Sequence, residues 1–177
     1  MSGGAFDIFP RGLIDEVSIR VRYLLAKQPI LRQWATGGVF RTKTLGPVPG
    51  VSLPYIVVAA LNVRSETRPG AEFLQLLDVA ILLVWEEFEA IAADDENSVA
   101  SATALIEKTL YNQPYLDIPE CGGDRVTERL DAILPTSLVR AASEDETKTV
   151  ISLQLAATYQ IATDMRTWTR FASPTET

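Results

Sequence analysis

Two long β-rich segments joined by a short link constrain this fold more than any other feature. Residues 55–64 and 72–85 are rich in β-branched, aromatic and aliphatic side chains, and the link between them, residues 65–71, contains a Pro-Gly pair typical of turns. Parallel strands need a crossover of a dozen or more residues, so these two strands are predicted to pair antiparallel in one long hairpin. The nearly unbroken apolar run at 55–61 further predicts cover on both faces of its strand.

Helical periodicity appears on either side of the hairpin. Residues 13–28 repeat apolar side chains at helical spacing and are predicted to form an amphipathic helix that Pro29 ends. A second helix is predicted from about Asn97 to Tyr111, because Asp94-Asp95-Glu96-Asn97 supplies N-cap chemistry and suits the helix dipole.

Three further strands complete the expected sheet. Residues 151–161 alternate apolar and polar side chains, which predicts a strand with one buried face. Residues 39–44 form a short candidate strand, whereas residues 125–134 fit either a helix or a strand, and Pro135 favours the strand. The expected fold class is α+β: a mostly antiparallel sheet of four to five strands with a long hairpin, and two helices packed on one face.

The chain is predicted to hold a single α+β domain at residues 13–163, with a flexible arm at 1–12 and a tail at 164–177. The arm lacks the basic-then-apolar order of a signal peptide. The most apolar run, residues 76–85, is far shorter than the roughly 20 residues of a membrane-spanning helix. We therefore expect a soluble product without a membrane partner.

Composition excludes most catalytic chemistry. The chain has no histidine and one cysteine, Cys121, so it cannot build a Ser-His-Asp triad, a Cys-His dyad or an ordinary zinc site. Adjacent carboxylates at Glu86–Glu87 and Asp94–Asp95 are the acid–base candidates left, but neighbours on a strand point to opposite faces. The sequence predicts no enzymatic activity, no catalytic residue, no cofactor and no metal.

Charge is distributed unevenly along the chain. The 16 basic and 23 acidic residues give a net charge of -7, which argues against a nucleic-acid-binding surface. Residues 1–68 carry nine basic and four acidic side chains, whereas residues 69–177 carry seven and nineteen. This asymmetry has two interpretations: solvated faces without further meaning, or a two-signed surface that directs association.

Seven residues are candidates for a subunit or partner interface. The loop at 45–54 holds three prolines yet is apolar, and it either folds over the core or orders against a partner. Both this loop and a second irregular segment, residues 112–124, are predicted to be mobile in an isolated subunit and to become ordered on assembly. Trp34 and Trp85 are expected in the core. The seven interface candidates are Leu45, Val48, Val51, Leu53, Arg64, Arg68 and Trp168.

The order of these elements resembles the tail terminator proteins of long-tailed bacteriophages. The resemblance rests on an N-terminal helix ending in LLAKQPIL, a Pro-rich lead into LPYIVVAALNVR, the LQLLDVAILLVW strand followed by the SATALIEKTLYNQ helix, and the closing VISLQLAATYQI strand. Together these motifs span roughly residues 13–163. The connection at 112–148 is longer than expected for a member of such a family.

The resemblance implies a structural virion protein of the tail and neck that assembles in the host cytoplasm. Such proteins form a ring, usually a hexamer, that caps the head-proximal end of the tail tube and stops its growth. Their partners are copies of themselves, the tail tube protein and the head connector or completion protein, and DNA passes the lumen without specific binding. Alternatives are another neck or tail protein (head-completion or tail-tube), a monomeric binding adaptor with a preformed apolar pocket, or a hydrolase that uses carboxylates.

Overall fold

The computed structural model describes residues 12–68, 72–88, 92–123, 125–142 and 148–161. The predicted arm and tail therefore lie outside the described residues, except Gly12. The elements in chain order are α2 (Leu13–Lys27), α3 (Pro29–Trp34), β1 (Gly38–Arg41), β2 (Tyr55–Arg68), β3 (Glu72–Phe88), α4 (Ala92–Tyr111), a 3₁₀ turn (Pro119–Cys121), β4 (Thr127–Ala142) and β5 (Lys148–Ile161). None of the helices described here is long and apolar enough to cross a membrane.

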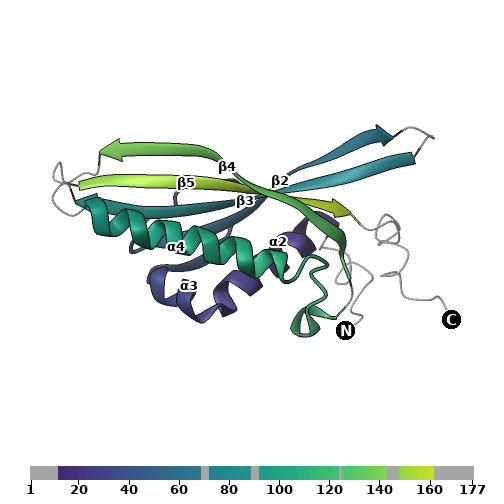
Figure 1. The fold of residues 1–177 in the computed structure, drawn as a ribbon, viewed down its shortest axis with the longest axis horizontal. Coiled ribbons are helices and arrows are strands. Elements are labelled where there is room, and N and C mark those ends of the chain that lie inside the picture. Colours follow the sequence, from purple (N-terminus) through teal and green to yellow (C-terminus); the bar gives the residue numbers. More distant parts are fainter. Residues whose placement is uncertain (1–11, 69–71, 89–91, 124, 143–147, 162–177) are drawn as a thin grey trace, which may run out of the picture.

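The strands form one open five-stranded sheet in the order β1-β2-β3-β5-β4, with the helices gathered on one face (Figure 1). Only β1 and β2 are parallel, and every other neighbouring pair is antiparallel. The predicted hairpin is present, with Tyr55 opposite Val84 at one end and Arg68 opposite Glu72 at the other. The α+β class and the mostly antiparallel sheet are confirmed.

The main core lies between the sheet and the helices. Alternate residues of β3 are fully buried and belong to one cluster with side chains of α2 and α4. They are Leu77, Val79, Ile81 and Leu83. Full burial of each such side chain stabilises the folded state by about 1.5–3 kcal/mol. From α2 the cluster takes a single stripe at helical spacing: Val17, Val21 and Leu25.

A second, smaller core covers part of the opposite face. Its buried residues are Tyr55, Val57, Leu82 and Val84, and apolar side chains of the loop at 45–54 pack over them. The backbone N–H of Val48 donates a hydrogen bond to the Tyr55 hydroxyl at 2.9 Å, which ties the loop down. Cover by helices on one face and by this loop on the other explains the continuous apolar run at the start of β2.

Two prolines, Pro29 and Pro135, lie within regular elements of the structure and not only at their boundaries. Pro29 does end the first helix, but it also begins α3, because the first position of a helix tolerates a residue without an N–H. The ambiguous segment after residue 125 is a strand, and it continues through Pro135 to Ala142. An edge strand tolerates proline because the missing N–H can lie on the unpaired side. Helix α4 begins at Ala92, five residues before the predicted start.

A buried ion pair fixes the irregular segment that leads into β4. Arg20 of α2 is 1% exposed and donates to Glu16 at 2.9 Å, to the Leu116 carbonyl at 2.7 Å and to the Cys121 carbonyl at 3.0 Å. The Thr127 hydroxyl donates to the Pro114 carbonyl at 2.7 Å. Residues 112–123 are thus packed against their own subunit, and their predicted mobility before assembly is not tested by this packing.

Candidate assembly interface

Among the described side chains of the sheet, the most exposed large apolar ones lie in the middle and C-terminal part of β4. Leu134, Leu138 and Val139 are 60%, 55% and 54% exposed. Strand β4 is the last strand on its side of the sheet, so the backbone groups on its outer edge have no neighbouring strand within the described chain. Long, exposed, apolar edges pair readily with another chain, and proteins that stay monomeric usually blunt them.

A second unpaired edge lies on the opposite side of the sheet. The short β1 pairs only with Tyr55–Val58 of β2, and Thr42 adds one more hydrogen bond to Val58. Beyond that point the outer edge of β2 runs on towards the hairpin tip without a described strand beside it (Figure 1). Leu61 and Val63 on this stretch are each 40% exposed. Among the strands that the structure describes, the sheet therefore presents two different unpaired edges.

The sequence pattern missed the β4 edge. The sequence pattern predicts a strand only over residues 125–134, up to Pro135, so Leu138 and Val139 fall outside it. The missed signal is the absence of any turn residue pair between Leu138 and Ala142. Because an edge strand can contain a proline, a stretch without turn residues after Pro135 can continue the same strand.

Arg64, a predicted interface residue, is tied to its own hairpin. Its guanidinium donates to Asp78 of β3 through two nitrogens, each 3.0 Å from a carboxylate oxygen, and Thr158 of β5 donates to the same carboxylate at 2.8 Å. Half of the Arg64 side chain is still exposed. Arg68 ends β2, but its side chain lies outside the described residues, as does the whole of Trp168.

The four loop candidates lie together in the second core. Leu45, Val48, Val51 and Leu53 are half-buried over Tyr55 and its neighbours. This is the arrangement expected of a loop that folds over its own sheet. A contact between these side chains and a partner stays a prediction. Trp34 and Trp85 pack partly buried against the main core, as expected.

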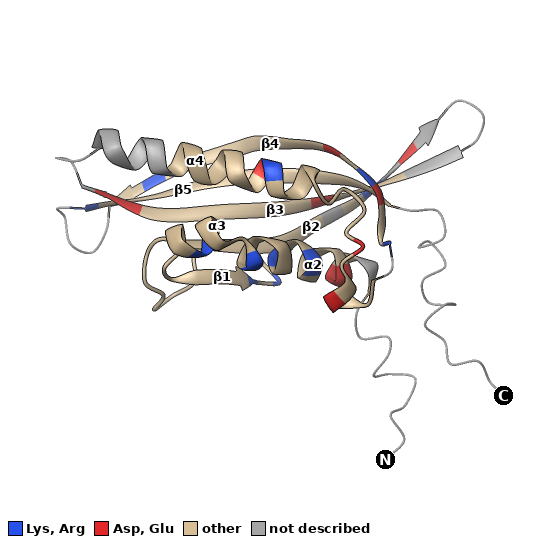
Figure 2. Ribbon diagram, turned by 60° about the horizontal axis from the view of Figure 1, so that its bottom comes forward, with Lys and Arg blue, Asp and Glu red and all other residues tan. Residues whose placement is uncertain are grey.

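Much of the basic charge at the N-terminal end is neutralised within the subunit. Arg20 is buried with Glu16, Arg41 pairs with Asp15, and Lys27 pairs with Glu120. The hydrogen bond between Lys27 and Glu120 raises the pKa of Lys27 and lowers the pKa of Glu120. Figure 2 shows Lys and Arg positions along α2 and α3. The exposed cations without a described carboxylate partner on this side are Arg22, Arg32 and Lys43.

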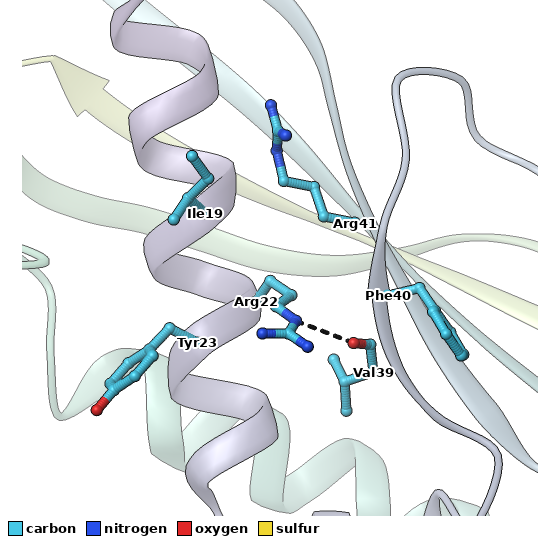
Figure 3. A pocket seen from close by; sticks show the side chains of 6 residues that line it. All are labelled: Ile19, Arg22, Tyr23, Val39, Phe40 and Arg41. Atoms are coloured by element: carbon cyan, nitrogen blue, oxygen red, sulfur yellow. Dashed lines mark hydrogen bonds between the residues drawn. The ribbon is translucent and has the colours of Figure 1, made fainter. Parts of the chain in front are cut away.

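A shallow pocket of about 320 Å³ lies between α2 and β1, lined by Ile19, Arg22, Tyr23, Val39, Phe40 and Arg41 (Figure 3). Both arginines are engaged there. Arg22 donates to the Val39 carbonyl at 2.9 Å, and Arg41 donates to the Ser18 hydroxyl at 2.8 Å. The polar groups of this pocket hold α2 against β1, so they are not free to orient a small ligand as a binding adaptor would require.

The acidic side chains do not converge in the described part of the chain. Glu86 lies 3.3 Å from Lys148 of β5, across the sheet face opposite the helices. The adjacent Glu87 is paired in register with Thr149 and points to the other face. No group of three potential metal ligands occurs among the residues that the structure describes. Asp94 and Asp95 have side chains outside the described set.

No family model matches this chain, and no curated protein matches it. Among solved structures, it is similar to a chain from a structure described as the virion of a native gene transfer agent particle. The sequences are 14% identical, the TM-score is 0.46, and the match covers 82% of this chain and 93% of that chain. A similarity of this size is not evidence of a shared function.

Proposed function

We propose that this chain is a structural virion protein of a phage tail or neck, and specifically a tail terminator. In this role it forms a homo-oligomeric ring, a hexamer, that caps the head-proximal end of the tail tube. The ring stops tube growth and presents the joining surface to the head connector. One observation carries the proposal: the described strands form a single open sheet in which β4 and the outer part of β2 are two different unpaired edges, on opposite sides.

Two different edges suit a ring because a ring closes by a heterologous contact, in which two distinct patches meet. An isologous dimer would need one self-complementary patch and would leave the other edge open. In such a ring, the β4 edge of each copy contacts the β2 edge of the next copy. The same contact, repeated around an axis, pairs the C-terminal part of β4 with the part of β2 beyond β1 in every copy.

The remaining parts of the proposal concern partners and location. The ring stacks on the tail tube protein on one side and on the head connector or completion protein on the other, inside the virion and, during assembly, in the host cytoplasm. DNA passes the lumen without specific binding, because a net charge of -7 repels its phosphates. The proposed role needs no catalytic residue, metal or cofactor.

Mass measurement by light scattering, combined with negative-stain microscopy, tests this proposal on the full chain. The expected result is a closed ring of uniform mass that does not grow with concentration, and that binds at one end of purified tail tubes. Open-ended tubes made by the chain itself would identify a tail-tube protein instead. A monomer at every concentration would overturn the ring and favour the adaptor.

A further inference from the structure

We propose that neighbouring copies join by β-sheet pairing: the outer edge of β4 in one copy pairs antiparallel with the outer edge of β2 in the next. The inference rests on the proposed ring and names the surfaces that form it. Main-chain hydrogen bonds between the two edges supply the contact, and exposed apolar side chains on both strands pack across it.

Strand direction favours this pairing. β4 is antiparallel to β5, β5 to β3, and β3 to β2. Therefore β4 and β2 run in opposite directions, and a second copy placed in the same orientation beside β4 presents β2 as an antiparallel neighbour. The sheet then continues from copy to copy with the more stable ladder pattern.

The exposed side chains lie on matching faces. Leu138 is paired in register with Leu153 of β5, and Val63 is paired with Leu77 of β3. Both of these partners belong to or pack against the main core, so Leu138 and Val63 both lie on the helix-bearing face. Because side chains directly opposite each other share a face, Leu138 can sit opposite Val63 in a continuous sheet.

This register also avoids β1. Within one copy, Leu138 lies in the row of Leu153, Leu83 and Ile56. Pairing with Val63, whose row passes through Leu77, instead shifts the next copy by about six residues along β3, roughly 20 Å. The stretch of β2 that β1 already occupies, Tyr55–Val58, then lies beyond the end of β4. A constant stagger of this kind is what tilts strands in closed barrels.

One described charge on each edge has the opposite sign of the other. Glu66 on β2 and Arg140 on β4 are both exposed, and neither has an ion-pair partner among the described residues. Arg64 on β2 is paired with Asp78, and the side chain of Arg68 at the end of β2 lies outside the described residues. Opposite charges at Glu66 and Arg140 help to orient approaching copies.

Disulfide trapping in the full chain tests the pairing. In a Cys121→Ser background, Val63→Cys and Leu138→Cys are combined, since directly opposite residues in a sheet have the Cα separation that a disulfide needs. Mild oxidation of the double variant should give a ladder of covalent oligomers that ends at the ring mass. Each single-cysteine variant should stay monomeric on a denaturing gel, because the contact joins two different edges.

The matched control replaces Leu138→Cys by Val139→Cys, whose side chain is equally exposed but points to the opposite face. The variant that combines Val63→Cys with Val139→Cys should give no ladder of covalent oligomers on oxidation. Disulfide dimers from Leu138→Cys alone would show β4 paired with itself and overturn the inference. Native rings without the ladder would overturn the pairing and leave the proposed function standing. A ladder in protein that forms only open chains would support the pairing and overturn the ring.

Discussion

Replacing Arg20 by methionine should destabilise the subunit by about 3–5 kcal/mol. Methionine keeps much of the volume of the side chain but leaves the Glu16 carboxylate, which is 5% exposed, without its buried cation. Removing one partner of a buried ion pair costs about this much, because the other charge stays in a poorly solvated site. The carbonyls of Leu116 and Cys121 lose a charged donor at the same time.

The size of this effect makes it measurable by urea denaturation followed by circular dichroism. A loss of about 4 kcal/mol is a large part of the 5–15 kcal/mol that stabilises a typical domain. For a chain of this length it corresponds to a fall in Tm of about 8–16 °C. Arg20→Lys keeps the charge but loses the planar fork that reaches several acceptors, so its cost should fall between wild type and Arg20→Met.

The matched control is Arg32→Met on α3, whose side chain is exposed. Surface replacements of this kind change stability by about 0.5 kcal/mol or less. The double variant Glu16→Leu with Arg20→Met should recover part of the loss, because it removes the stranded carboxylate. Equal midpoints for Arg20→Met and Arg32→Met would show that the buried pair does not hold the segment before β4.

Three further predictions concern a buried hydroxyl, alkaline pH and salt. Tyr159→Phe should raise the free energy of unfolding by about 1–3 kcal/mol, since the buried Tyr159 hydroxyl has no hydrogen-bond partner among the described residues; a lower urea midpoint would contradict this. Burial raises the pKa of Tyr159, so above the unfolded pKa of about 10 the unfolded chain loses this proton while the folded chain keeps it, and the free energy of unfolding falls as the pH rises. The free energy of unfolding measured from about pH 9 to 11 should therefore fall less steeply for Tyr159→Phe than for wild type, and an equal slope would contradict this. Raising ionic strength to about 1 M, where screening acts within about 3 Å, should slow ring formation but leave formed rings intact, and stopped-flow light scattering with a salt-independent rate would refute charge steering.

Much of the fold follows from local sequence patterns, because those patterns depend on local physics. A short Pro-Gly link forces the hairpin, and the alternation at 151–161 forces a strand with one buried face, whatever lies around them. The apolar stripe of α2 likewise predicts a helix packed against a core. The absence of histidine limits catalytic chemistry without any structure at all.

Tertiary structure alone decided which of these elements lie at an edge and what covers them. No local pattern shows that β4 is the last strand, and only that position lets Pro135 sit within it and leaves Leu138 exposed. The partners of Arg20 at the Leu116 and Cys121 carbonyls are 96 and 101 residues away in the chain. Likewise, only the structure places Leu45 and Val48 over Tyr55, Val57, Leu82 and Val84, while a contact of this loop with a partner stays a prediction. Pairing and burial between distant segments are collective properties of the whole chain, so the two free edges of the candidate interface became visible only once the sheet order was known.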